Sequence, residues 1–354
     1  MDHLQRVRQL MEEEELEALF ICQPENRRYV SGFTGTSAYL LITEEEALLL
    51  TDFRYVEQAK TQAPAFTIVQ HGNPALPEIA RQVQRLGISH LGFETEFINV
   101  ATYQALKELL PQSQLVAADA LLIRARAVKD AAELEALQIA CTIADQAFQA
   151  ALDVLRPGIT EREIAWTLER TMREAGASGL SFDTIVASGQ RGSMPHGVAS
   201  SKTIVSGECV TLDFGCIYDG YCSDETRTVA VGHPPEQLVE IYSIVKEAQE
   251  AALQAAQPGI SGRELDAVAR KIIAAHGFGD AFGHSLGHGV GLAVHEAPSI
   301  APNSEWILQE NMVVTDEPGI YLPGIGGVRI EDDLLITAEG AKRLTRAPRE
   351  LLIL

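Results

Sequence analysis

Acidic side chains recur at matching places in two β-hairpin patterns of the second half of the chain. Each pattern carries one acid on either side of a glycine-containing turn, and folding a hairpin brings residues of its two strands to opposite or diagonal positions. Two such hairpins packed together would gather four carboxylates, which cannot share an apolar centre unless cations neutralise them. The acids are Asp213 and Asp224 in residues 208–231, and Glu317 and Glu331 in residues 311–337.

Histidines add a nitrogen ligand to this acidic set. Four of the nine histidines fall within residues 276–295, in a glycine-rich run that indicates close approach of the backbone to another segment. His288, flanked by glycines, is the best ligand candidate, whereas His276 near a helix end is expected to be hydrogen-bonded or exposed. Carboxylates with one imidazole suit two divalent ions such as Mn²⁺, Co²⁺ or Zn²⁺. A phosphate-binding loop is disfavoured, because no GxGxxG or Walker pattern is present.

A simpler interpretation competes with a metal site. An acid within an apolar strand usually belongs to the solvated face of a half-buried sheet, and Asp224-Glu225 or Glu331-Asp332-Asp333 could simply be strand ends. Four acids at equivalent places of a repeat favour the site. Asp316 and Glu317 are adjacent, and alternate strand faces allow only one of them to point at the metals. The strand pattern by itself leaves open which of the two does so.

An internal repeat predicts how these residues are positioned. The segment 157–164, PGITEREI, reappears 101 residues later as PGISGREL at 258–265. Each copy follows a long alanine-rich helix and carries a capping box, formed by Thr160 with Glu163 and by Ser261 with Glu264. A histidine and a hairpin follow each copy. We therefore expect a duplicated helix–helix–hairpin unit, with two halves around a pseudo-twofold axis.

The first third of the chain has a different pattern. Short β-like runs at 38–42, 47–51 and 66–69 alternate with helical patterns at 52–62, 77–86 and 100–110. This order predicts an α/β domain that ends near Leu122, before a long helix over 130–155. We place the domain boundary between residues 1–124 and 125–354. The amphipathic pattern of Leu4, Val7, Leu10 and Met11 predicts a helix at the N-terminus.

Composition narrows the class of protein. The chain has 354 residues, of which 46% are hydrophobic and 22% charged, as expected for a globular protein of about two domains. Its formal net charge of −21 argues against nucleic-acid binding. The sequence has no uninterrupted apolar run of about 18 residues, so it predicts no membrane helix. The charged N-terminus is unlike a secretory signal. Five cysteines without CxxC spacing indicate free thiols, and we expect a cytoplasmic protein.

The order Asp213, Asp224, His288, Glu317, Glu331 resembles the five-ligand dimetal signature of the pita-bread metallopeptidases, which include prolidase, aminopeptidase P and methionine aminopeptidase. The surrounding stretches, such as SDETRT, GHGVG, VHEAP, EPGIY and GGVRIED, are similar to that signature. Residues 28–35, RYVSGFTG, and 51–55, TDFRY, resemble the creatinase/prolidase N-terminal domain. The resemblance covers the whole chain and favours the X-Pro branch. It implies an α/β (α+β) protein, with a creatinase-like α/β domain at 1–124 and a pseudo-twofold pita-bread catalytic domain at 125–354.

The resemblance also implies roles for individual residues. Two divalent ions, Mn²⁺ or Co²⁺ in the first place and Zn²⁺ as a further choice, would be held by the five ligands, with Asp224 and Glu331 bridging both. The ions would supply an activated water, and Glu317 would pass its proton to the leaving amine. The expected catalytic residues are His196, His295 and Glu317; His196 and His295 would stabilise the oxyanion. The expected substrate-binding residues are His284, Tyr321 and Arg329, with Arg329 pairing either with a ligand carboxylate or with the substrate C-terminus.

The implied activity is hydrolysis of the bond between an N-terminal residue and proline. The chain length leans towards an X-Pro dipeptidase acting on small peptides with proline at the second position. The alternative is an X-Pro aminopeptidase acting on longer peptides. A more remote alternative is a non-enzymatic peptide- or protein-binding module, since the same fold serves that role where ligands have been lost. A metal-free creatinase-like hydrolase is disfavoured because the carboxylate set is intact. The resemblance also implies a homodimer, with no nucleic-acid or membrane partner.

Overall fold

The computed structural model describes residues 2–354, and the chain forms two compact units, Met1–Arg126 and Ala127–Leu354. The boundary expected after Arg124 lies inside helix α6 (Asp119–Ala127). The division between the two units falls one residue before the end of this helix. Among the described residues, no helix combines the length and the apolar composition needed to cross a membrane.

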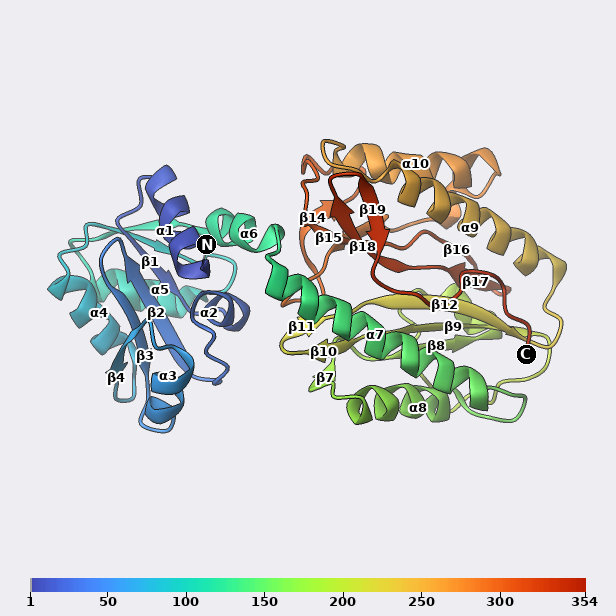
Figure 1. The fold of residues 1–354 in the computed structure, drawn as a ribbon, viewed down its shortest axis with the longest axis horizontal. Helices are drawn as coiled ribbons and strands as arrows, with labels where there is room; N and C mark the ends of the chain where they lie inside the picture. Colours follow the sequence, from blue (N-terminus) through green and yellow to red (C-terminus); the bar gives the residue numbers. More distant parts are fainter. Residues whose placement is uncertain (1) are drawn as a thin grey trace. The chain divides into compact units, whose positions relative to one another are not determined.

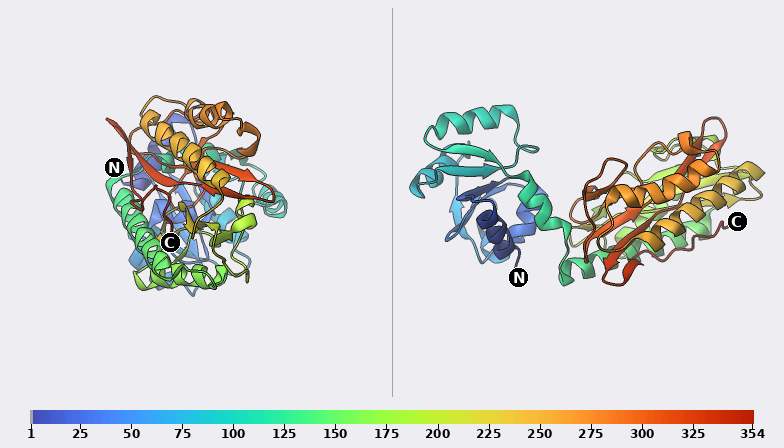
Figure 2. Two further views of the ribbon diagram at one scale, coloured as in Figure 1. Left: turned by 90° about the vertical axis from the view of Figure 1, so that its right-hand side faces the viewer. Right: turned by 90° about the horizontal axis from the view of Figure 1, so that it is seen from above.

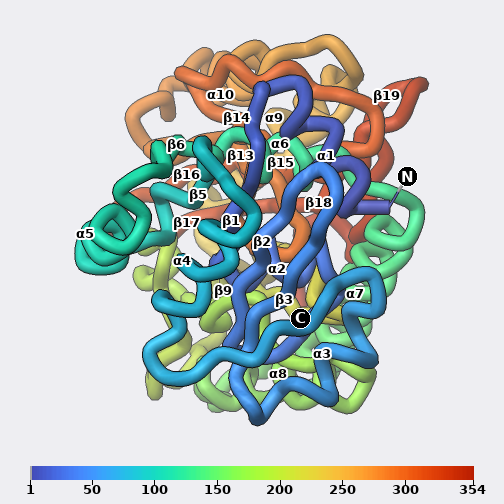
Figure 3. The backbone as a smooth tube through the Cα atoms, turned by 90° about the vertical axis from the view of Figure 1, so that its left-hand side faces the viewer, coloured from blue at the N-terminus to red at the C-terminus, as the bar shows by residue number. Residues whose placement is uncertain are grey.

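The N-terminal unit is built on a six-stranded sheet in the order β4-β3-β2-β1-β5-β6. Figure 3 labels the strands from β3 to β6 of this order. Strand β2 is antiparallel to both neighbours, and the other adjacent pairs are parallel. The strands are β1 (Ala18–Ile21), β2 (Ala38–Thr43), β3 (Ala47–Thr51), β4 (Thr67–Gln70), β5 (His90–Phe93) and β6 (Gln114–Ala117).

Helices cover both faces of this sheet (Figure 2). On one face, Ile79 of α4 and Leu106 of α5 pack with Phe20 and Leu91 of the central strands in one buried cluster. Strands β1 and β3 are buried on both faces, so they appear in the sequence as continuous apolar runs. The helices are α1 (His3–Glu13), α2 (Pro24–Ser31), α3 (Val56–Gln62), α4 (Leu76–Arg85), α5 (Val100–Leu109) and α6.

The predicted strands at 38–42 and 47–51 and the predicted helices at 77–86 and 100–110 are confirmed to within one residue. The helix predicted over 52–62 starts only at Val56. The Asp52 carboxylate accepts hydrogen bonds from the backbone N–H of Arg54, at 3.0 Å, and from its Nε, at 2.9 Å. Such a local side-chain bond stabilises a turn in competition with the helix, and it delays the helix by one turn.

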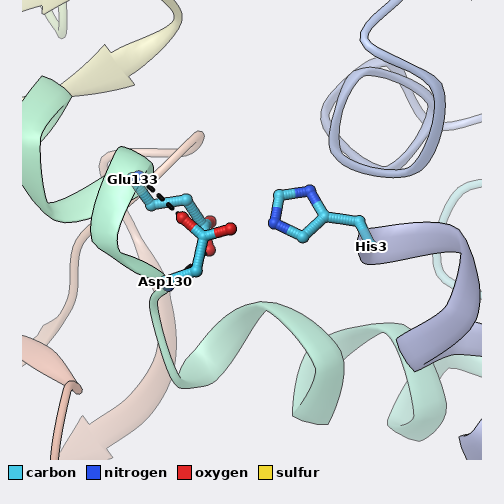
Figure 4. A group of neighbouring side chains, drawn as sticks. All are labelled: His3, Asp130 and Glu133. Carbon is cyan, nitrogen blue, oxygen red and sulfur yellow. Dashed lines mark hydrogen bonds between the residues drawn. The ribbon is translucent and has the colours of Figure 1, made fainter. Parts of the chain in front are cut away.

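The C-terminal unit has two helix pairs on opposite sides of its strands (Figure 1). The pairs are α7 (Ala131–Val154) with α8 (Glu161–Glu174), and α9 (Glu236–Ala255) with α10 (Gly262–Ala275). Helix α7 begins at a capping box (Figure 4): Asp130 accepts from the N–H of Glu133 and Glu133 accepts from the N–H of Asp130, both at 2.9 Å. Two short 3₁₀ helices span Gly189–Ser193 and Gly279–Ala281.

Two antiparallel sheets lie between these helix pairs. One has the order β12-β9-β8 and the other the order β14-β13-β15-β18-β19, and β11-β10-β7 and β16-β17 form small extensions. The strands are β7 (Gly179–Leu180), β8 (Ile185–Ser188), β9 (Glu208–Phe214), β10 (Cys216–Tyr218), β11 (Tyr221–Cys222), β12 (Glu225–Val231), β13 (Gly287–Gly289), β14 (Glu296–Ile300), β15 (Val313–Asp316), β16 (Gly319–Leu322), β17 (Gly326–Arg329), β18 (Asp332–Thr337) and β19 (Gly340–Arg343).

The predicted repeat is confirmed by equivalent contacts in the two halves. Helices α8 and α10 both start with a complete capping box, at Thr160 and at Ser261. In the turns before them, Gly158 N–H donates to the Ile204 carbonyl and Gly259 N–H donates to the Leu308 carbonyl, each at 2.9 Å. Each half also has its own apolar cluster. The two halves therefore repeat one helix–helix–hairpin design.

The hairpins differ from the expectation in one respect. Of the four acids, only Asp213 lies within a strand, whereas Asp224, Glu317 and Glu331 lie at breaks between consecutive strands. Asp213 pairs with Thr226, so Asp224 is its diagonal neighbour. Pro318 follows Glu317 and cannot donate to a ladder, which explains one break. A break frees the backbone to bend, so the side chains at these positions can turn towards a common point.

Candidate active site

The structure brings every predicted site residue to one cavity of about 840 Å³ within the C-terminal unit. The cavity is formed where the two hairpins, the β13 segment and the loop before β9 meet. Its lining includes the predicted residues His196, Asp213, Asp224, His284, His288, His295, Glu317, Tyr321, Arg329 and Glu331.

The carboxylates and His288 form the floor of this cavity. Ligand atoms of Asp224, His288 and Glu331 all lie within 4.8 Å of one another. The Nε2 atom of His288 is 3.7 Å from Asp224 Oδ2 and 3.4 Å from Glu317 Oε1. These distances are those of groups that surround a shared central position.

Burial and mutual repulsion both act on the acids of this cluster. Burial, followed by repulsion from Glu331, raises the pKa of Asp224 well above its usual range. Burial, followed by repulsion from Glu317 and Asp213, does the same to the pKa of Glu331. In addition, the buried Oδ1 of Asp213 has no hydrogen-bond partner among the described residues. Hard oxygen donors with one imidazole fit divalent ions, so the residues present fit a divalent metal centre.

Glu317, and not Asp316, faces the cavity. Glu317 lines it and accepts a hydrogen bond from Thr315 Oγ1 at 3.3 Å. Burial alone would raise the pKa of Glu317, but the hydrogen bond and charge of His288 outweigh it and lower that pKa. Asp316 is buried away from the cavity, and burial raises its pKa well above the usual range. The two neighbouring acids therefore lie in different environments, Glu317 in the cavity and Asp316 buried away from it.

Glycines allow His288 to reach this position. A Cβ atom on Gly287 would lie 2.1 Å from the Thr315 carbonyl oxygen, and one on Gly289 would lie 2.2 Å from that of Ala297. Both distances are far below van der Waals contact, so β13 can pack between β14 and β15 only with glycine on each side of His288. The backbone N–H of His288 also donates to Thr315 Oγ1 at 3.0 Å. The close approach expected from the glycine-rich run is therefore confirmed.

His295 lies beside His288, and the two rings meet edge to face with centroids 4.3 Å apart. Burial, followed by repulsion from His288, lowers the pKa of His295. The His295 ring is therefore neutral at neutral pH, and one ring nitrogen remains able to donate. His196, from the other half of the unit, lines the same cavity.

Arg329, Tyr321 and His284 form a hydrogen-bonded chain along another wall. Arg329 Nη1 donates to Tyr321 Oη at 2.8 Å, and Tyr321 Oη is 2.9 Å from His284 Nε2. Burial raises the pKa of Tyr321 to about 12, so its hydroxyl stays protonated. Arg329 Nη2 also binds the Asp213 carboxylate. Of the two partners expected for Arg329, the structure contains the ligand carboxylate.

Two threonines in the site were not predicted. Thr226 Oγ1 donates to Glu331 at 2.5 Å and accepts from Arg329 Nε at 3.0 Å, while Thr315 contacts Glu317 and His288. Thr226 follows Asp224 by two positions and Thr315 precedes Glu317 by two, so the period of a strand could have identified both. Three apolar residues that line the cavity were also not predicted: Phe182, Ile185 and Val198.

Comparisons with known proteins agree with this geometry. Residues 135–338 match the metallopeptidase family M24, and residues 3–128 match the creatinase/prolidase N-terminal domain. An Xaa-Pro dipeptidase of Pyrococcus furiosus is 42% identical over 352 residues, which cover 99% of each chain. Among solved structures, an Xaa-Pro dipeptidase from Bacillus anthracis has a TM-score of 0.97 at 47% identity and covers 100% of this chain and 99% of its own.

A further similar structure is that of an X-Pro aminopeptidase, from Thermotoga maritima. It has a TM-score of 0.90 at 40% identity and covers 98% of this chain and 100% of its own. The likeness thus extends over both units. The chain therefore belongs to metallopeptidase family M24, as a peptidase with a creatinase/prolidase N-terminal domain and a pita-bread catalytic domain.

Proposed function

We propose that this protein is an X-Pro dipeptidase, which hydrolyses the bond between an N-terminal residue and proline. The observation that carries the proposal is the complete acid–imidazole set in one cavity, with no member replaced. Two relatives that match the chain from end to end, at 42% and 47% identity, are Xaa-Pro dipeptidases. The catalytic domain of the proposal spans residues 125–354.

The cofactor of the proposal is a pair of divalent ions, Mn²⁺ or Co²⁺ in the first place, with Zn²⁺ as a further choice. Bound ions would lower the pKa of water and polarise the scissile carbonyl. The residues that would hold them are Asp213, Asp224, His288, Glu317 and Glu331. Their oxygen-rich composition favours harder ions over a zinc site of sulfur and nitrogen ligands.

The chain's own groups would handle the proton and the developing charge. Glu317 lines the cavity beside the other proposed ligands, so it can accept a proton from water and deliver it to the proline nitrogen. His295 and His196 would donate hydrogen bonds to the carbonyl oxygen as negative charge develops there. The cavity-lining residues Phe182, Ile185 and Val198 are suited to apolar parts of the peptide.

Arg329, Tyr321 and His284 would position the substrate and one ligand. The Arg329 guanidinium holds the Asp213 carboxylate, and through Tyr321 it fixes the ring of His284 at the cavity surface. A fixed donor array of this kind can bind a carbonyl or a terminal carboxylate without reorganising.

An X-Pro aminopeptidase is the second candidate, because the similar Thermotoga maritima structure is that of an X-Pro aminopeptidase. An assay separates the two after reconstitution with Mn²⁺ or Co²⁺, with Leu-Pro, Leu-Pro-Ala and Leu-Ala as substrates. Cleavage of Leu-Pro alone supports the dipeptidase, and efficient cleavage of Leu-Pro-Ala supports the aminopeptidase. Protein that holds metal and cleaves none of them contradicts both and favours a peptide-binding module.

Two further proposals concern the protein's state in the cell. We propose a homodimer, and light scattering that gives the mass of a single 38.4 kDa chain would refute it. We propose a cytoplasmic location, supported by five cysteines that are all free and buried. Detection of the protein outside the cytoplasmic fraction would contradict this location.

A further inference from the structure

Arg227, on strand β12, is a buried cation that the proposed chemistry does not use. It is only 1% exposed and is one of the largest fully buried side chains of the described residues. Its neighbours Thr226 and Thr228 are buried as well. An arginine in such a place must satisfy five N–H donors without water.

The guanidinium finds partners on both halves of the C-terminal unit. Nη1 donates to the carbonyl of Thr226 at 2.9 Å and to the carbonyl of Glu331. Nη2 donates to Asp332 Oδ1 at 2.7 Å and lies 3.1 Å from Glu225 Oε1. The partner residues are Glu331 itself, Asp332 next to it, and Glu225 and Thr226, which follow Asp224. Asp224 and Glu331 are the two acids that the family resemblance implies as bridging ligands. The contact therefore joins the segment 224–226 of one hairpin to the segment 331–332 of the other.

The remaining donors hold the C-terminal segment. Nη2 also donates to the carbonyl of Ala347 at 2.9 Å, and Nε donates to that of Pro348 at 3.0 Å. Beyond this point, the chain continues beside β12, where Ala230 N–H donates to the Leu352 carbonyl at 2.8 Å. A single side chain thus connects three segments that are distant in sequence.

Stability alone does not account for this arrangement. Removing a guanidinium and two carboxylates from water is costly, and apolar side chains of similar volume often stabilise a core at least as well. A planar fork, however, fixes the directions of several carbonyls and carboxylates at once, which apolar contacts do not. The geometry of Arg227 is therefore suited to orienting the carbonyl and carboxylate groups that it binds.

We propose that Arg227 is a positioning residue that clamps the two ligand-bearing segments together and thereby sets the separation of Asp224 and Glu331. This role rests on the proposed metal centre. Arg227 does not line the cavity itself. It binds the carbonyl of Glu331 and the carboxylates of Glu225 and Asp332, which are next to Asp224 and Glu331, so it acts on the metal centre through these segments. It thereby controls how well two ions are held at the same time.

The substitution Arg227→Lys tests this role, since lysine keeps the charge and loses the planar fork. Arg343→Lys is a matched control. Arg343 also binds Asp332, at 2.9 Å, and the Ala347 carbonyl, at 2.9 Å, and it makes no hydrogen bond or ion pair with residues 225, 226 or 331 in the part of the chain that the structure describes. Metal-free samples of wild type and both variants are titrated with Mn²⁺ by calorimetry. Co²⁺-loaded samples give visible absorption spectra, and circular dichroism checks folding.

For Arg227→Lys we expect at least tenfold weaker binding of the second Mn²⁺ ion, an altered Co²⁺ spectrum, and a lower kcat on Leu-Pro with KM nearly unchanged. For Arg343→Lys we expect metal affinity within about twofold of wild type. A folded Arg227→Lys with wild-type affinity and spectrum overturns the inference, and so does an equal loss in both variants. Wild type that binds no Mn²⁺ overturns the proposed function and this inference with it.

A measurement on the wild type keeps the test independent of whether the variant folds. Hydrogen exchange is followed by mass spectrometry with and without Mn²⁺. The clamp predicts that metal slows exchange in three segments together: 224–232, 329–335 and 345–352. Protection limited to the first two segments contradicts a clamp that includes the C-terminal segment.

Discussion

Glu317 is the residue on which proton transfer depends in the proposed reaction. Substitution of Glu317 by Gln keeps the size of the side chain and removes the group that accepts and delivers the proton. We expect kcat on Leu-Pro to fall by about 10²–10⁴-fold, with the circular dichroism spectrum unchanged.

The neighbouring acid supplies the control for this experiment. Asp316 is buried away from the cavity, and burial raises its pKa well above the usual range. Asp316→Asn should therefore retain most of the activity. Full activity of Glu317→Gln, or equal losses in both variants, would contradict the assignment of the proton carrier.

The two neighbouring histidines, His288 and His295, make different contributions to the site. His288 is close to Asp224 and Glu317, whereas His295 contacts the His288 ring and has a lowered pKa. We expect His288→Ala to lose metal affinity in calorimetry. We expect His295→Ala to keep metal affinity and to lose about 10²-fold in kcat, as removal of an oxyanion donor does. Loss of metal by both variants would place His295 among the ligands instead.

Sequence patterns predict the candidate metal ligands better than the residues that position those ligands. Asp213, Asp224 and His288 could be predicted because their types, order and surroundings are all local in the sequence. Arg227 could not be predicted, because its partners include carbonyl oxygens of residues 104 to 121 positions away. Main-chain acceptors leave no signature in side-chain types, so only the folded structure reveals such contacts.

At the scale of elements, the repeat makes the two halves comparable. The helix starts at Thr160 and Ser261 have the same capping geometry, with the hydroxyl accepting from the N3 backbone N–H at 3.3 Å and 3.2 Å. We expect Thr160→Ala and Ser261→Ala each to lower the free energy of unfolding by about 1 kcal/mol. Urea denaturation measures both, and a large inequality between them would argue against equivalent halves.

Element boundaries show where local patterns fail. The long helix α7 could be predicted because an N-cap, a capping box and an apolar periodicity agree over many residues. The breaks at Asp224 and Glu331 could not be predicted, because a bend inside an apolar strand depends on what packs against it. The late start of α3 also differs from the prediction, since the Asp52–Arg54 contact competes with helix formation.

At the scale of the whole molecule, the five cysteines are distributed over both units and are all buried. Burial raises the pKa of Cys209 to about 12 and that of Cys216 to about 11. The thiolate is the reactive form, so we expect no thiol to react with a disulfide reagent at pH 8 in the native protein and all five to react after unfolding. Rapid reaction of a native thiol at pH 8 would contradict this burial.

The composition of the whole chain also bears on function. The chain has a formal net charge of −21, and acidic residues also line its cavity. Such a field attracts cations and repels phosphate backbones. The division into an N-terminal α/β unit and a duplicated C-terminal unit could be predicted from the change of periodicity along the chain, whereas the helical state of the segment that joins them could not.

The most direct test of the central claim is hydrolysis of Leu-Pro during a metal titration. Protein is stripped with a chelator, dialysed, and titrated with Mn²⁺ while bound metal and the release of proline are both measured. We predict no hydrolysis by the metal-free protein and activity that rises to a plateau at two bound ions per chain. Unchanged hydrolysis by the metal-free protein, or no hydrolysis with two ions bound, would contradict the proposed metal-dependent peptidase.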